Sequence, residues 1–156
     1  ESDDLILTVT LAGLSADPGA AVGFSGVALE VYIDMNGLAG SGATRLLGDR
    51  RPRVAARDAW EFAVTVDGRG AALWRVGQPR PARIEDLVAE STPARGEIRV
   101  RLPGRRLRGN PAGWGFLTLS TPDGWTEPAA LLGAAAEELP PSGPPPLLKA
   151  ARLFTK

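Results

Sequence analysis

The chain of 156 residues contains no cysteine and no histidine. Without cysteine it has no disulfides, thiolate zinc sites or cysteine nucleophiles. Without histidine it lacks the most common metal ligand and general base, so an enzyme with this sequence would have to use carboxylates, lysine, tyrosine or serine. A metal site would have to be built from oxygen ligands, which favours calcium.

The charge balance and the lack of long apolar runs exclude two further kinds of partner. Lys+Arg and Asp+Glu both number 18, so the formal net charge is zero, and we expect no binding to nucleic acid or to an anionic membrane surface. No apolar run reaches the roughly 18 residues of a membrane-spanning helix. The first residues, ESDD, have no signal-peptide pattern, which agrees both with a leader already removed and with a longer parent chain.

Alternating apolar and polar residues predict a series of short β-strands. The clearest is 27–34 (VALEVYID), where one face is apolar and the other carries Glu30, Tyr32 and Asp34, so we expect a half-buried strand. Similar patterns occur at 5–14, 60–66, 71–76, 82–90, 97–102 and 114–120. With glycine and proline turns between them, these segments predict an all-β, antiparallel β-sandwich of immunoglobulin-like or jelly-roll-like type with little helix.

The C-terminal part is less regular. Residues 114–120 are expected to be well buried, 103–110 to hold one helical turn, and 129–138 to have the best helix composition. A proline-rich segment over 139–147 precedes a possible last strand at 147–154. We interpret 1–156 as one domain, because this length suits a single hydrophobic core.

Three segments in order resemble a known family: GFSGVALEVYIDMNGLAGSGATRLLG, then DAWEFAVTVDGRG, then IRVRLPGRRLRGNPAGWGFLTL. They are similar to the C-terminal domain of glucodextranase, which is grouped with DOMON-like and family 9 carbohydrate-binding modules. The resemblance implies a β-sandwich accessory module of an exported protein, associated with polysaccharide or the cell surface. Family members often carry an NPWG-like segment before the Gly-Phe-Ser, whereas this chain has SADPGAAV, with no tryptophan.

Two tryptophans are candidates for carbohydrate binding. Sugars stack on flat aromatic faces beside polar groups that bind their hydroxyls. Trp125 follows a Pro-Asp-Gly turn and Trp74 shares its strand with Arg75, although partial burial is the alternative for both. Trp60 and Trp114 begin apolar strands and are expected in the core.

Oxygen ligands near loop ends predict a calcium site at Asp34, Asn36 and Asp58. The glycine-rich loop NGLAGSG would expose backbone carbonyls beside them. The alternative is that Asp34 and Asn36 form turns and accept hydrogen bonds from the backbone. No haem is expected, because the chain has no histidine and one methionine, Met35, to serve as axial ligand.

These observations predict a non-catalytic module that binds polysaccharide or a cell-surface glycan. We expect it in an extracellular or cell-surface protein, with an adjacent catalytic domain as one candidate partner. Asp58 and Glu61 are not interpreted as a glycosidase pair, since a small sandwich rarely encloses the cleft that such a pair needs. The basic runs at 45–57 and 105–108 are interpreted as solvated faces. The alternative function is a structural or protein-interaction domain that packs against a neighbour without a ligand.

Overall fold

The computed structural model describes residues 4–49, 53–122 and 151–155. Its strands are β1 (Leu5–Thr10), β2 (Ser15–Ala16), β3 (Phe24–Ser25), β4 (Val27–Asp34), β5 (Phe62–Asp67), β6 (Gly70–Arg75), β7 (Ala82–Leu87), β8 (Ala89–Thr92), β9 (Glu97–Leu102), β10 (Gly115–Pro122) and β11 (Ala151–Thr155). The helical elements in this part of the chain are single 3₁₀ turns: η1 (Leu47–Asp49), η2 (Ala56–Asp58), η3 (Pro93–Arg95) and η4 (Pro111–Gly113).

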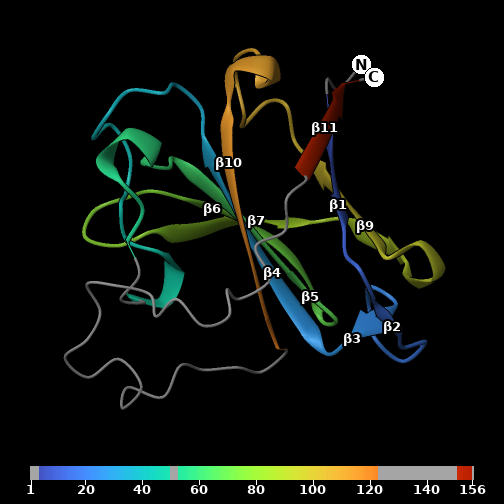
Figure 1. Ribbon diagram of the computed structural model, residues 1–156. Helices are drawn as coiled ribbons and strands as arrows, with labels where there is room; N and C mark the ends of the chain where they lie inside the picture. The colour runs from blue at the N-terminus through green and yellow to red at the C-terminus, as the bar shows by residue number, and fades with distance from the viewer. Residues whose placement is uncertain (1–3, 50–52, 123–150, 156) are drawn as a thin grey trace.

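Two main sheets form the sandwich (Figure 1). One has four strands in the order β11-β1-β9-β8, and the other has five in the order β10-β4-β5-β6-β7. All strand pairings among the described residues are antiparallel. The fold class expected from the sequence, an all-β antiparallel sandwich, is therefore confirmed.

The main core lies between the two sheets. The predicted alternation of β1 and β9 is confirmed, because every second side chain of each strand is buried and joins this core. The buried residues of this core are Leu5, Leu7, Val9, Leu11, Val22, Phe24, Leu29, Val31, Ile33, Phe62, Val64, Val66, Ala71, Leu73, Ile98, Val100, Leu102, Leu107 and Trp114. At about 25 cal/mol per Å² of apolar surface removed from water, this burial is the main term that stabilises the fold.

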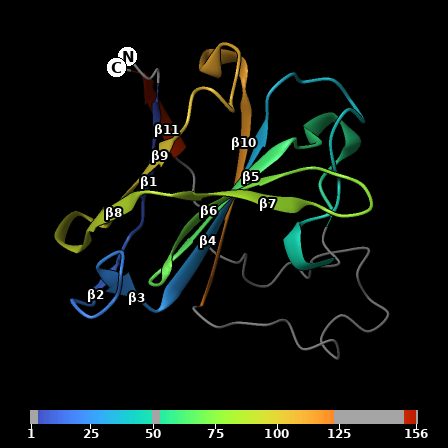
Figure 2. The same ribbon diagram turned by 180° about the vertical axis from the view of Figure 1, so that it is seen from behind.

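The segment 82–90, expected as one strand, is two strands that belong to different sheets. Figure 2 shows β7 at the edge of the five-stranded sheet continuing into β8 at the edge of the four-stranded sheet. The chain changes sheet at Val88, whose side chain is 71% exposed. The prediction failed because a period of two cannot show where a chain leaves one ladder for another.

The prediction that 27–34 is half-buried is wrong. The inner face joins the main core, but Glu30, Tyr32 and Asp34 on the other face are buried as well. The covering segment, which we call the arm (residues 43–49 and 53–60), folds over the outer face of the five-stranded sheet. It is closed by bridges between Ala43 and Trp60 and between Arg45 and Arg53.

A second core lies under the arm. Its buried members are Tyr32, Leu46, Leu47, Trp60 and Ala63. Trp60 was expected to share a face with Phe62, but it packs in this second core on the opposite side of the sheet. The alternation breaks at Glu61, where the chain bends before β5 begins. The expected burial of Trp60 and Trp114 is confirmed.

Two predictions near the C-terminus are also wrong. The segment 114–120 is not well buried, because β10 is an edge strand and most of its side chains are partly exposed. The expected helical turn over 103–110 is instead an ordinary turn, and a 3₁₀ turn follows at Pro111–Gly113. The possible last strand is present as β11, which pairs with β1. The helix expected at 129–138 and the whole proline-rich segment at 139–147 lie outside the described residues.

Candidate functional site

The outer face of the five-stranded sheet carries a groove beside the arm, which we call the Trp74 groove. Its volume is about 830 Å³. Its lining comes from β4, β5, β6, the first half of the arm and the loop after β6: Glu30, Gly42, Ala43, Thr44, Arg45, Leu46, Leu47, Gly48, Thr65, Trp74, Val76, Gly77, Pro79, Arg80 and Pro81. The groove therefore combines an indole, apolar side chains and charged groups of both signs.

Trp74 is held in a fixed orientation in this groove. Its indole Nε1 donates a hydrogen bond of 3.0 Å to the Thr65 hydroxyl on the neighbouring strand. The side chain is partly buried and packs against the second core. Since the N–H already has an acceptor, the ring offers a ligand mainly its apolar surface, which suits stacking. Trp125, the other predicted sugar-binding residue, lies outside the described residues.

Asp34 closes the turn that follows β4. Its Oδ1 accepts hydrogen bonds from the backbone N–H groups of Asn36, at 3.1 Å, and Gly37, at 2.8 Å. Asn36 also caps the backbone of this turn: its Oδ1 accepts a hydrogen bond of 2.7 Å from the N–H of Leu38. These are the bonds of turn-forming residues, the alternative raised from the sequence.

Glu61 holds this loop in place through three contacts, a role that was not predicted from the sequence. Its Oε2 accepts a 2.8 Å hydrogen bond from the N–H of Met35, and its Oε1 accepts one of 2.8 Å from Asn36 Nδ2. The Ser41 hydroxyl also lies 2.8 Å from Oε1. The contacts span 20 to 26 residues of sequence, so no local pattern could have revealed them.

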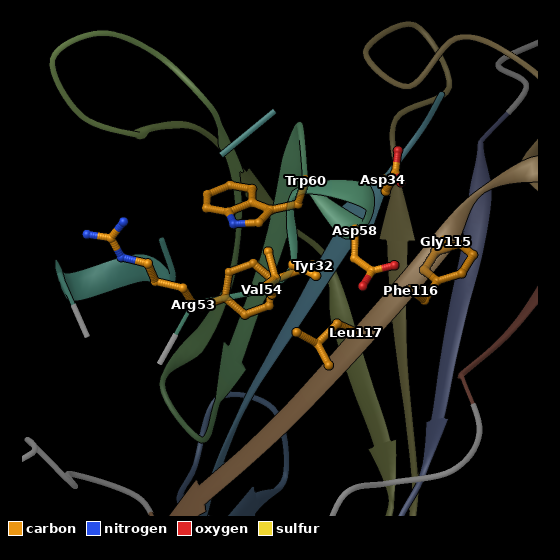
Figure 3. Close-up of a pocket in the computed structure, with 10 residues that line it drawn as sticks. Tyr32, Asp34, Arg53, Val54, Asp58, Trp60, Gly115, Phe116 and Leu117 are labelled. Atoms are coloured by element: carbon orange, nitrogen blue, oxygen red, sulfur yellow. The ribbon is translucent and has the colours of Figure 1, made fainter. Parts of the chain in front are cut away.

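The structure brings Asp34 and Asp58 to one pocket and leaves Asn36 out of it. This second hollow, the Asp34 pocket, has a volume of about 500 Å³. Its lining residues, drawn as sticks in Figure 3, are Tyr32, Asp34, Arg53, Val54, Ala55, Asp58, Trp60, Gly115, Phe116 and Leu117. Asp58 is exposed and pairs with Arg57 at 3.4 Å. No group of three or more carboxylates is placed to hold a metal ion within residues 4–49 and 53–122, so calcium at Asp34, Asn36 and Asp58 stays a prediction.

The basic run at 105–108 is partly neutralised by an acidic neighbour. Arg106 Nε donates a 3.1 Å hydrogen bond to Glu85 Oε2, and Arg105 donates to the other carboxylate oxygen. The hydrogen bond from Arg106, followed by the bond and charge of Arg105, lowers the pKa of Glu85 against the opposing effect of desolvation. This arrangement agrees with a solvated, salt-bridged face.

In the part of the chain that the structure describes, no helix is long and apolar enough to cross a membrane. Comparison with curated proteins gave no match. A family model described as the C-terminal, SLH-like binding module of glucodextranase matches residues 1–129. This match covers both main sheets except β11. The chain therefore belongs to the family of SLH-like C-terminal binding modules of glucodextranase.

Proposed function

We propose that this chain is a non-catalytic module that binds polysaccharide or a cell-surface glycan through the Trp74 groove. Membership of a family of binding modules gives the general role. The observation that supports the location is the partly buried indole of Trp74 in an open groove, with Glu30, Arg45 and Arg80 among the lining residues. Apolar stacking on a ring, with polar groups around it to bind hydroxyls, is the usual chemistry of sugar recognition.

The carboxylates support a binding role over a catalytic one. Glycoside hydrolysis needs two carboxyl groups that flank the scissile bond, one as acid and one as base or nucleophile. Of the pair considered from the sequence, Glu61 has both oxygens occupied by the loop after β4, whereas Asp58 lies on the exposed arm. In the proposed function, the module belongs to an extracellular or cell-surface protein and holds a neighbouring catalytic domain near its polymer.

Titration with glycans tests this proposal. We expect maltodextrin, dextran or a cell-wall polysaccharide to change tryptophan fluorescence and to give a binding isotherm by calorimetry. Trp74→Ala should weaken that binding at least tenfold, whereas Trp74→Phe should retain part of it because a ring remains. Leu38→Ala is the matched surface control, since Leu38 is 64% exposed and does not line the groove.

Two outcomes would contradict the proposal. Binding that survives Trp74→Ala unchanged would remove the groove as the site, and Trp125→Ala would then test the other predicted tryptophan. The absence of a response to every glycan, together with a stable complex with a neighbouring domain, would favour the protein-interaction function.

A further inference from the structure

We propose that the Asp34 pocket is a second saccharide subsite, which binds a sugar ring through hydroxyl donors. This inference rests on the proposed function, but it concerns a different site. The Asp34 pocket and the Trp74 groove have no lining residue in common. The volume of about 500 Å³ falls within the range of roughly 300–1,000 Å³ that small-ligand sites occupy.

The strongest indication is one oxygen of a nearly buried carboxylate. Asp34 is only 8% exposed and lines the pocket. Its Oδ1 is occupied by the N–H groups of Asn36 and Gly37, whereas Oδ2 has no hydrogen-bond partner among the described residues. No buried side-chain oxygen of the described residues lacks a hydrogen-bond partner, so Oδ2 is open to the pocket. A ligand hydroxyl can donate to it there in place of water. The two backbone bonds also fix the carboxylate in advance, which reduces the entropy lost on binding.

The remaining surface of the pocket suits a sugar better than a free ion. Val54 and Leu117 are partly buried, apolar lining residues that pack against the second core, in which Tyr32 and Trp60 are buried. The ring of Phe116 packs against the main core instead. The polar atoms of Tyr32 and Trp60 are already bonded: Trp60 Nε1 donates to the Arg45 carbonyl at 3.0 Å, and Tyr32 Oη accepts from Leu47 N at 3.0 Å. Tyr32 and Trp60 are each only 1% exposed, so the apolar surface that a ligand can reach comes from Val54 and Leu117. This surface matches the C–H face of a sugar ring.

Two charged side chains complete the rim. Asp58 adds a second carboxylate acceptor, and Arg53 adds guanidinium donors, both on exposed parts of the arm. In Figure 3 Asp34 and Asp58 lie at one end of the pocket and Arg53 at the other, with Val54 and Leu117 between them. A sugar hydroxyl both donates and accepts, so such a ligand can use both ends. A simple cation would gain nothing from Arg53 or from the apolar walls.

The pocket and the groove open on the same side of the five-stranded sheet, next to different halves of the arm. Gly42 to Gly48 line the groove, whereas Arg53, Val54, Ala55 and Asp58 line the pocket. A polymer that engages both sites would gain avidity from effective concentration, without any new contact. We therefore expect long glucan chains to bind more tightly than fragments that reach one site.

The test uses two variants that leave the turn after β4 intact. Asp34→Asn keeps Oδ1 as the acceptor for Asn36 and Gly37, but replaces Oδ2 with a donor. Gly115→Leu fills the pocket from the facing strand: a Cβ at this glycine would lie 3.5 Å from Asp34 Cβ and 3.8 Å from Oδ2, an ordinary contact. Gly113→Leu is the matched control, because a Cβ there meets nothing within 4 Å and the residue does not line the pocket.

The readout is the ¹⁵N-resolved NMR spectrum during titration with maltoheptaose, isomaltoheptaose and dextran. The amides of Gly115 and Leu117 report the pocket, which both residues line, and Leu117 is the reporter in Gly115→Leu. The Trp74 indole N–H reports the groove. We expect the signals of both sites to shift, and we expect Asp34→Asn to lower affinity at the Gly115 site about ten- to hundredfold. Gly115→Leu should abolish binding at the Asp34 pocket, whereas Gly113→Leu should preserve it. None of the three variants should change the response of Trp74 to short fragments.

Each failure has a distinct signature. Shifts at Trp74 alone, unchanged by both pocket variants, would overturn the second subsite and leave the proposed function standing. Shifts at neither position would overturn both. Binding at Gly115 by simple amines, with a strong loss of affinity at high salt, would assign the pocket to a cationic ligand and overturn the sugar assignment. Thermal melting of each variant confirms that the pocket was changed in a folded protein.

Discussion

Tyr32 and Trp60 meet edge to face on the outer side of the five-stranded sheet, with ring centroids 5.0 Å apart and an interplanar angle of 64°. Each side chain is only 1% exposed. The contact joins β4 to the end of the arm, two segments separated by the glycine-rich loop. It fixes the arm on a surface that would otherwise face solvent, and this creates the boundaries of both proposed sugar sites.

The Tyr32 hydroxyl is predicted to stabilise the packing of the arm against the five-stranded sheet. It donates to the Glu30 carboxylate and accepts a hydrogen bond from the Leu47 backbone N–H. Tyr32→Phe keeps the ring but leaves the Leu47 N–H unpaired in the second core. We expect the free energy of unfolding to fall by about 1–3 kcal/mol, the usual penalty for a buried polar group left without a partner.

Urea denaturation of the wild type and of Tyr32→Phe measures this change, with Val88→Ala as an exposed control. A double-mutant cycle with Tyr32→Leu and Trp60→Leu should in addition give a coupling of about 0.5–1.5 kcal/mol for the ring pair. Unfolding free energies that do not change for Tyr32→Phe would mean that the hydroxyl contributes nothing to holding the arm.

Glu61 is predicted to order the loop after β4. Its carboxylate accepts from the Met35 N–H and from Asn36 Nδ2, so Glu61→Ala removes two acceptors at once. We expect a loss of about 1–2 kcal/mol in stability and faster hydrogen exchange of the Met35 amide. Glu90→Ala serves as the control, because Glu90 is exposed and lies on β8 in the other sheet. Exchange at Met35 that stays slow in Glu61→Ala would contradict this role.

The sequence predicted the sandwich well because its main core follows from local periodicity. The strands β1 and β9 alternate as expected, because one face of each meets the opposite sheet. The expected inner face of β5 and β6 also joins the main core, although Ala63 and Ala72 on the outer face are buried as well. The outer face of β4 could not be predicted in the same way. Its burial depends on the arm, which is held by non-local bridges such as Ala43 to Trp60 rather than by any repeating pattern.

The candidate sites show the same division. Trp74 could be singled out because an aromatic residue beside polar groups is visible in one strand. The role of Glu61 could not, because its partners come from a loop more than 20 residues earlier. Asp34 was identified by residue type and predicted as a calcium ligand. Its pairing with Gly115 across β4 and β10, which defines the pocket, required the strand register.

The predicted calcium site has a direct thermodynamic test. An ion bound by Asp34, Asn36 and Asp58 in the folded state alone would raise the melting temperature, because such a ligand shifts the folding equilibrium by mass action. Scanning calorimetry with calcium and with chelator measures the effect. Asp58→Asn should abolish the increase, because it removes a charged ligand of the ion. The turn after β4 should stay intact in this variant, since Asp58 contributes no hydrogen bond to it. Equal melting temperatures under both conditions would rule out a structural calcium ion.

The hairpin between β5 and β6 is predicted to carry a measurable pH dependence of stability. Burial tends to raise the pKa of Asp67, but the hydrogen bonds and charge of Arg69, together with backbone N–H groups, outweigh it, so the pKa lies below its usual value of 3.8. Arg69 Nε donates to Asp67 Oδ2 at 3.1 Å, and the Arg69 N–H donates to Oδ1 at 2.8 Å. Because Asp67 binds protons less readily in the folded state, its ionised form stabilises the fold.

This contribution is complete above the unfolded-state pKa of about 3.9 and is lost as the pH falls through the lower pKa of the folded state. Asp67→Asn keeps the turn acceptor but removes the charge. We therefore expect it to lower the free energy of unfolding by up to about 1 kcal/mol at pH 7, with a smaller difference at pH 2–3. Urea denaturation across this range measures the change, and in an Arg69→Gln background the difference should largely disappear. A difference that grows towards low pH would contradict the assignment, because it would require a raised pKa.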